Sequence, residues 1–288
     1  MNILRWIMVA CWDCPRGCGV VRDLELGACR APGRAVVATA MVHMGEEAII
    51  SGSGGSGTVF FSGCNLGCVF CQNHNISQVC RGEKMDAEAL ANTFLKLEAD
   101  WVHNINLVSP SHFSAQIAEA IKLAKQKGIK LPFVYNSGGY DSLKTLKEMD
   151  GLIDIYMPDL KFADDALGSK YSGVDDYFSV AAPAIAEMAR QAGAPVVAGG
   201  IMHRGLLVRH LVMPGMVQDS MAALDWLKAN APDAIVNIMD QYRPTYQAHN
   251  YPEINRRLDA GEYRQVVEYY EKLEFKYAHL LPQGYMFL

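Results

Sequence analysis

Short apolar runs alternate with amphipathic stretches along most of the chain. Runs that are apolar or alternate apolar with polar residues, as strands do, occupy residues 58–62, 103–109, 131–136, 152–157, 206–213 and 234–239. Apolar residues at helical spacing predict helices over about 86–100, 114–128, 142–149, 176–192, 219–229 and 262–273. Asp86 is a candidate N-cap, and Gly128 and Gly193 are placed to end two of these helices.

Six strands separated by helices predict parallel βαβ units in an α/β fold. Six are too few for a closed eight-stranded barrel, so we expect an open, partial (β/α)6 TIM-like barrel. Ligands of such sheets bind at the carboxyl ends of the strands. Polar and glycine residues gather at those six places: 64–71, 109–112, 136–139, Asp159 with Lys161, 213–215 and 240–242.

The chain is predicted to divide into a Cys-rich N-terminal segment, 1–50, and a barrel with a C-terminal helical cap, 51–288. Residues 36–50 could form one or two short strands. The segment SGSGGSG, 51–57, is either a flexible linker or a glycine loop that leads by close approach into the first barrel strand. The start, MNILRWIMVACWDC, briefly resembles a signal peptide, but it leads into CWDCPRGC rather than a small-residue cleavage site, so secretion is not expected.

Composition limits the classes of partner. About half of the 288 residues are hydrophobic and a fifth are charged, enough for a sizeable core. The net charge of −5 argues against generic attraction to nucleic acid or anionic membrane. Arg204, Arg209 and His210 could form a local basic groove or simply a solvated face. No apolar run is long enough to span a bilayer, so neither a nucleic-acid nor a membrane partner is expected.

The eight cysteines are clustered rather than spread, which points to metal binding in a reducing compartment and hence the cytoplasm. One set, Cys11, Cys14, Cys18 and Cys29, lies among prolines and glycines. Four such thiols can close a tetrahedral zinc site, hold an iron–sulfur cluster, or remain free and buried.

The second set is Cys64, Cys68 and Cys71, spaced Cys-x3-Cys-x2-Cys within GCNLGCVFCQNHN. Cubane clusters normally take four thiolates, and the next cysteine, Cys80, lies nine residues farther on. Three thiolates therefore suggest a cluster with one iron open to an exchangeable ligand. The alternative is a zinc site completed by His74 or His112.

The motif CNLGCVFC resembles the Cys-x3-Cys-x-aromatic-Cys signature of the radical S-adenosylmethionine (SAM) superfamily. The chain further resembles uncharacterised iron–sulfur proteins related to the pyruvate formate-lyase activating enzymes, from Cys11 to about Glu271. The segments that carry this resemblance are CPRGCGVVR, GSGTVFFSGCNLGCVFCQN, NINLVSPSHF, YNSGGY, DIYMPDLKF, VRHLVMPG and NIMDQYRP.

The resemblance implies that Cys64, Cys68 and Cys71 bind a [4Fe–4S] cluster whose fourth iron is chelated by SAM. A low-potential electron donor such as flavodoxin or ferredoxin would then drive cleavage of SAM to methionine and a 5′-deoxyadenosyl radical, which takes hydrogen from a substrate. The substrate would be an unknown protein, peptide or small molecule, with a glycyl-radical partner protein as the family analogy.

The resemblance also implies roles for single residues. Phe70 would lie near the adenine of SAM. Asp159 and Lys161 stand in a DLK motif whose lysine pairs with the cofactor carboxylate; the alternative is a surface ion pair of Lys161 with Asp159 or Asp164.

The remaining candidates come from the other strand ends. Asn136 and Ser137 correspond to the polar pair after the third strand, and Gln241 with Tyr242 could reach the ribose. The Gly-Gly-Glu-like motif usual after the second strand is replaced by SPSH, 109–112, so Ser109 and Ser111 become the candidate acceptors for the methionyl amino group.

Two other classes of function remain open. The chain could be an iron–sulfur electron-transfer or cluster-carrier protein, or a zinc-binding interaction module without turnover. In the radical SAM interpretation, the N-terminal cysteines add a possible second iron–sulfur cluster or zinc ion.

Overall fold

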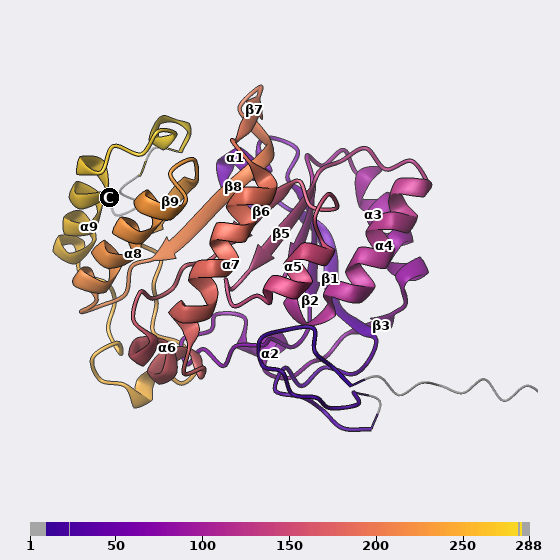
Figure 1. Ribbon diagram of the computed structural model, residues 1–288, viewed down its shortest axis with the longest axis horizontal. Coiled ribbons are helices and arrows are strands. Elements are labelled where there is room, and N and C mark those ends of the chain that lie inside the picture. Colours follow the sequence, from indigo (N-terminus) through magenta and orange to yellow (C-terminus); the bar gives the residue numbers. More distant parts are fainter. Residues whose placement is uncertain (1–9, 23, 282, 284–288) are drawn as a thin grey trace, which may run out of the picture.

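The computed structural model describes residues 10–22, 24–281 and 283, so most of the apolar start of the chain, predicted not to be a signal peptide, lies outside the described residues. The described strands form one sheet in the order β3-β1-β2-β4-β5-β6-β8-β7, with β9 also paired to β8 (Figure 1). The strands are β1 (Ala35–His43), β2 (Ser56–Phe61), β3 (Glu83–Met85), β4 (Ile105–Val108), β5 (Phe133–Ser137), β6 (Ile155–Pro158), β7 (Val196–Ala198), β8 (Ile201–Leu211) and β9 (Ile235–Met239).

Strands β2, β4, β5, β6, β8 and β9 pair in parallel, each with the next. These are the six predicted strands. Among the described residues no pairing joins β9 back to β1, β2 or β3, so the sheet is not closed. The predicted fold class, an α/β partial TIM-like barrel, is confirmed.

Strand β1 lies in the 36–50 stretch that was expected to form one or two short strands, and two three-residue strands, β3 and β7, extend the sheet beyond the prediction. Strand β1 pairs antiparallel with β2, and β3 pairs antiparallel with β1 at the outer edge. Strand β7 forms an antiparallel hairpin with the start of β8. The division at residue 50 stays a prediction, but β1, which precedes it, is hydrogen-bonded to β2, which follows it.

Helices cover the outer face of the sheet (Figure 1). Asp86 caps α3 as predicted, because its side chain accepts a hydrogen bond from Ala89 N at 2.9 Å. Helix α6 was not predicted, since its sequence, DALGSKYS, is polar and contains an internal glycine. The helices are α1 (Ala48–Ser51), α2 (His74–Ser77), α3 (Ala87–Glu98), α4 (Ser114–Gln126), α5 (Leu143–Glu148), α6 (Asp165–Ser172), α7 (Tyr177–Ala192), α8 (Val217–Asn230) and α9 (Ala260–Lys272).

The concave side of the sheet has its own small core, separate from the large core beneath the outer helices. Ile49 and Ile50 of α1 pack there against inward-facing strand residues, among them Val134, Ile155 and Leu207. Side chains alternate in direction along a strand, so residues two positions farther on, such as Asn136 and Arg209, face the same interior nearer the carboxyl ends. Helix α1 therefore closes the amino end of the barrel and leaves its carboxyl half polar.

The glycine-rich segment before β2 is a packed turn rather than a linker. A Cβ on Gly52 would lie 2.2 Å from Ile201 Cδ1, and one on Gly54 would lie 2.8 Å from the Trp101 carbonyl oxygen. Gly55 has φ +77° and leads directly into β2. The close-approach interpretation is confirmed, and these glycines lie at the end of β2 remote from the cysteines.

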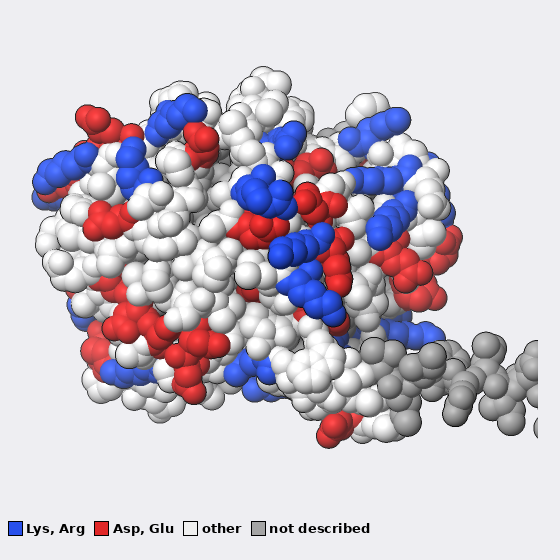
Figure 2. All heavy atoms as spheres, viewed as in Figure 1, with Lys and Arg blue, Asp and Glu red and all other residues white. Residues whose placement is uncertain are grey.

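On the face shown in Figure 2, basic and acidic side chains are interspersed rather than gathered into a single basic surface. No helix of the described residues is both long and apolar enough to cross a membrane.

Acid should destabilise the protein through the buried His210. His210 is buried between Leu160 O, to which Nδ1 donates at 2.6 Å, and Ser220 Oγ at 2.8 Å. Burial lowers its pKa to about 4, so the unfolded chain binds a proton more readily below pH 6.5. Its contribution to the free energy of unfolding is present above pH 6.5 and lost toward pH 4, on the order of 2–3 kcal/mol.

Urea unfolding of the cluster-free protein between pH 7 and 4.5 measures this. His210→Gln should reduce the pH dependence without abolishing it, because burial also lowers the pKa of His112 to about 4, whereas substitution of the exposed His203 by glutamine should leave it unchanged. Equal slopes in all three proteins would refute a role for His210.

Candidate active site

The three cysteines of the Cys-x3-Cys-x2-Cys array lie on the loop that follows β2 and line one cavity of about 230 Å³. Helix α6 holds this loop: Gly67 N and Val69 N donate to the carbonyls of Ser172 and Tyr171 at 2.8 and 2.9 Å. Within the loop, Cys68 Sγ lies 3.4 Å from Ser172 Oγ. The unpredicted helix therefore positions the predicted site.

The environment of the thiols matters for what they bind. Burial raises the pKa of Cys64 to about 12, and the neighbouring Cys68 and Cys71 add to the effect. Burial also raises the pKa of Cys68, while the charge of Lys161 acts in the opposite direction. These thiols hold their protons at neutral pH, so a metal centre must displace the protons when it binds.

The thiols suit a cluster better than a single ion. No three His, Cys, Asp or Glu side chains among the described residues converge as ligands of one metal ion. His74 lies instead with Nδ1 3.1 Å from Cys71 O and its ring stacked on Tyr246, and His112 Nε2 lies 2.8 Å from Ser62 O. The zinc alternative completed by either histidine finds no support in this geometry. Three thiols spread around one cavity fit a [4Fe–4S] cluster, whose irons are separate ligand positions.

Most of the other predicted cofactor residues reach the same cavity. Its lining includes Phe70, Ser109, Asn136, Ser137, Asp159, Lys161, Gln241 and Tyr242. Ser109 has φ +58°, a left-handed conformation that is uncommon for serine, and it turns the backbone directly after β4. Ser111 is buried beside Asp141 and lies outside the cavity lining.

The polar centre of the site is a charge network. Asp159 Oδ1 accepts from Arg209 Nε at 2.8 Å, and its Oδ2 accepts from Lys161 Nζ. Arg209 Nη2 also donates to Asn136 Oδ1 at 2.8 Å. Burial alone would raise the pKa of Asp159, but the charges of Arg209 and Lys161 outweigh burial and lower it. Lys161 thus pairs with Asp159, yet its side chain is only 16% exposed, so the pair is not a surface ion pair.

Two buried groups hold the strand ends in place. The Tyr177 hydroxyl lies 2.9 Å from Lys161 N, from Gly138 O and from Asp159 O, and so ties the loops after β5 and β6 together. The Asp141 carboxylate accepts hydrogen bonds from Ser137 Oγ at 2.6 Å and from the Tyr135 hydroxyl at 2.9 Å. Asp141, which does not line the cavity, therefore fixes the orientation of the Ser137 hydroxyl.

The N-terminal Cys-rich segment packs beside the cysteine loop, at the carboxyl ends of the strands (Figure 1). Arg16 Nε donates to Asn65 O at 2.8 Å, and a Cβ on Gly63 would lie 2.5 Å from Cys29 O. Burial raises the pKa of Cys14 to about 12, with smaller contributions from Cys29, Cys11 and Cys18, so the four thiols lie near one another. They do not converge on one ion, and a second cluster or zinc site stays a prediction.

The sequence profile of the Radical SAM superfamily matches residues 58–227, which contain the cysteine loop and five of the six parallel strands. The chain belongs to the radical SAM superfamily. An uncharacterized protein of Methanocaldococcus jannaschii, MJ0674, is 31% identical over 281 residues, covering 94% of this chain and 77% of that one.

Solved structures show the same fold. Methylornithine synthase (PylB) superposes with a TM-score of 0.53 at 17% identity, over 75% of this chain and 62% of that one. Streptococcus suis SuiB bound to the precursor peptide SuiA superposes with a TM-score of 0.50 at 14% identity, over 73% of this chain. This radical SAM chain spans only 43% of the SuiB chain.

Sequence reasoning missed part of the site. Arg209 was considered only as part of a basic groove, although the alternation of β8 places it inside the barrel beside Asp159. Glu46 and Glu47, just before α1, also face this interior. Only Arg209 carried a sequence signal, the charged residue within an otherwise apolar strand, LLVRHLVM.

Proposed function

We propose that this protein is a radical SAM enzyme that holds a [4Fe–4S] cluster on Cys64, Cys68 and Cys71 and binds SAM in the adjoining cavity. One observation supports this above all: the three thiols and the DLK residues, Asp159 and Lys161, line the same cavity although nearly 90 residues separate them. Membership in the superfamily supplies the general chemistry, SAM-dependent radical formation.

When bound, cluster and SAM supply a single redox step: one electron from a low-potential donor breaks a carbon–sulfur bond, giving methionine and a 5′-deoxyadenosyl radical that takes a hydrogen atom from the substrate. The protein's own groups bind and orient. Lys161 offers a cation for the SAM carboxylate, and Asn136, Ser137 and Gln241 offer polar groups. Phe70 is 7% exposed, and its ring centroid lies 6.0 Å from that of Tyr242. The two rings offer an apolar surface suited to adenine.

Three classes of substrate are candidates. SuiB binds a precursor peptide, which makes a peptide one candidate, and activation of a glycyl-radical partner protein is another; a small molecule is the third. A flavodoxin or ferredoxin is the proposed electron donor. A reducing compartment such as the cytoplasm suits the free thiols.

The proposal is tested by anaerobic reconstitution with iron and sulfide, followed by SAM and dithionite. We expect about four irons per chain on this loop and release of 5′-deoxyadenosine. Lys161→Ala should keep the iron but weaken SAM binding about tenfold or more, while Lys122→Ala, an exposed lysine of α4, should not. A fully reconstituted protein that forms no 5′-deoxyadenosine would instead be an electron-transfer or cluster-carrier protein.

A further inference from the structure

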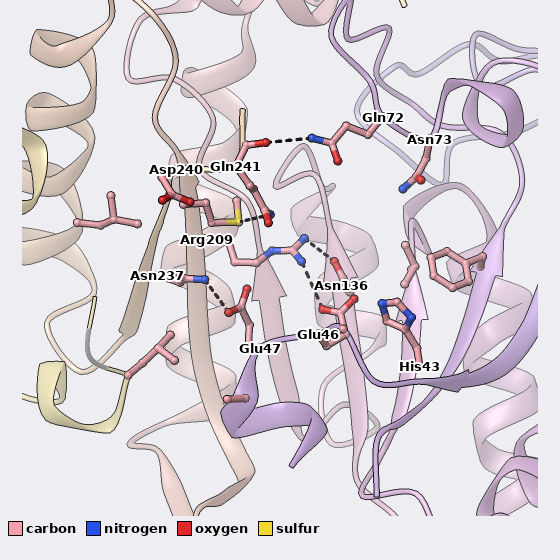
Figure 3. Close-up of a pocket in the computed structure, with 17 residues that line it drawn as sticks. His43, Glu46, Glu47, Gln72, Asn73, Asn136, Arg209, Asn237, Asp240 and Gln241 are labelled. Atoms are coloured by element: carbon pink, nitrogen blue, oxygen red, sulfur yellow. Dashed lines mark hydrogen bonds and ion pairs between the residues drawn. The ribbon is translucent and has the colours of Figure 1, made fainter. Parts of the chain in front are cut away.

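A second, larger cavity of about 600 Å³ adjoins the proposed SAM site, and Figure 3 shows the side chains that line it. The two cavities share Asn136, Arg209 and Gln241, so they are direct neighbours with common wall residues. The volume lies within the usual range of small-ligand sites, roughly 300–1,000 Å³. We call the part lined by Glu46, Glu47, Asn237 and Asp240 the acidic cavity.

The lysine and the arginine near this cavity are already matched by carboxylates. Arg209 lines both cavities and Lys161 lines the proposed SAM site. Asp159 accepts hydrogen bonds from both side chains. Glu46 Oε2 lies 3.5 Å from Arg209 Nη1 and has a side chain only 11% exposed. These two acids therefore balance the two cations.

Two further carboxylates form no ion pair with any lysine or arginine of the described residues. Glu47 Oε2 accepts from the neutral Asn237 amide at 2.6 Å, and Figure 3 shows the two side chains meeting at the cavity wall. Asp240 is 5% exposed, lines the cavity, and its Oδ2 has no hydrogen-bond partner in the described part of the chain.

Leaving these carboxylates uncompensated is costly. A carboxylate oxygen that is buried without a partner, as Asp240 Oδ2 is, loses its hydration and gains nothing in return, a penalty of about 1–3 kcal/mol or more. Burial raises the pKa of Glu47 even though Arg209 and Asn237 act in the opposite direction. A ligand that supplies positive charge would relieve both groups.

An inorganic cation does not fit this arrangement. The carboxylates line a large space from different elements, and no three acidic, His or Cys side chains among the described residues converge on one ion. An organic cation is larger than a metal ion and carries several N–H donors, so separated acceptors such as Glu47, Asp240 and Asn237 Oδ1 can each receive one.

We propose that the acidic cavity binds an ammonium or guanidinium group of the substrate, with Glu47 and Asp240 as acceptors. This inference rests on the proposed function. The acidic cavity adjoins the SAM site, and a substrate bound in it would therefore have a carbon–hydrogen bond near the radical. The cation is either a free amine or the side chain of a lysine or arginine in a peptide.

Binding can be measured without turnover. Anaerobically reconstituted protein with SAM and no reductant is titrated with n-butylammonium, butylguanidinium, neutral n-butanol and anionic butanoate, by calorimetry or saturation-transfer NMR. We expect a cation to bind about tenfold or more tightly than n-butanol, with butanoate weaker still. Equal binding of the neutral and cationic probes would overturn the proposal, and this comparison needs no variant.

Variants then locate the site. Asp240→Asn and Glu47→Gln keep side-chain shape and should each weaken cation binding about tenfold while leaving n-butanol unchanged. Glu119→Gln, on the exposed face of α4, is the matched control and should bind as the parent does. Full cation affinity in both cavity variants would place the cation elsewhere and refute the inference.

A peptide pair separates the two sources of the cation. If acetyl-Gly-Lys-Gly-amide binds more tightly than both n-butylammonium and the norleucine peptide acetyl-Gly-Nle-Gly-amide, the source is a side chain; if n-butylammonium binds more tightly, it is a free amine. Either result supports a cation site. Formation of 5′-deoxyadenosine by the parent protein is scored separately: its absence overturns the proposed function, whereas its presence without cation binding overturns only this inference.

Discussion

Alanine at Cys64, Cys68 or Cys71 should reduce 5′-deoxyadenosine formation to background. Each of the three thiols lines the same cavity, and no other cysteine does. A cluster needs a thiolate on each of three irons to remain bound, so the two thiols that remain should not hold it. Iron and sulfide analysis after anaerobic reconstitution, beside chromatographic assay of 5′-deoxyadenosine, measures the loss.

Cys80→Ala is the matched control for these substitutions. Cys80 is also half-buried and lies sixteen residues beyond Cys64, but outside the cavity lining. It should keep both iron and product formation. Activity that survives any of the three cavity substitutions, or disappears equally in Cys80→Ala, would show that the cluster is held elsewhere.

The triple variant also tests the N-terminal cysteines. Iron that persists after Cys64, Cys68 and Cys71 are all replaced would support a second cluster on Cys11, Cys14, Cys18 and Cys29. Zinc in its place would make that set a structural site, consistent with the close contact between Cys29 O and Gly63. A protein that retains neither metal would leave those four residues as free thiols.

The positions of the strand ends could be predicted from local pattern alone. Asn136, Asp159 and Gln241 each follow a short apolar run, and parallel strands bring such residues to one rim. Their convergence with the cysteines in one cavity follows from that topology. Asp86, with its helical run behind it, likewise carries its own local signal.

The interior of the barrel could not be predicted in the same way. Glu46 and Glu47 face Arg209 and Asn237 because α1 folds beneath the barrel, a contact between segments more than 160 residues apart in sequence. A four-residue helix has too little periodicity to be recognised, and nothing local distinguishes these glutamates from solvated ones. Ser111 differs from the other candidates: its role toward SAM stays a prediction from family position, and the turn after β4 directs it toward Asp141.

Asp159→Asn should cost about 3 kcal/mol of unfolding free energy in the cluster-free protein. The asparagine keeps the shape of the side chain but removes the charge that both Lys161 and Arg209 face. Lys161 and Arg209 are 16% and 17% exposed. Without the carboxylate between them the two cations repel each other, and water reaches them too little to offset that repulsion. Because the pKa of Asp159 is lowered in the folded state, its contribution is fully present above the unfolded pKa of about 3.9 and lost as pH falls through the folded value.

Asp150→Asn supplies the comparison, since Asp150 pairs with Arg190 at the same 2.8 Å distance on the surface. The side chains of Asp150 and Arg190 are 46% and 59% exposed, and exposed pairs contribute less than about 1 kcal/mol. Urea unfolding at pH 7 distinguishes the two, and adding Lys161→Met to Asp159→Asn should restore part of the loss by removing one unpaired cation. Equal, small losses at Asp150 and Asp159 would mean that solvent reaches the network freely. In that case Arg209 and Lys161 would be available to bind SAM or substrate anions without first leaving Asp159.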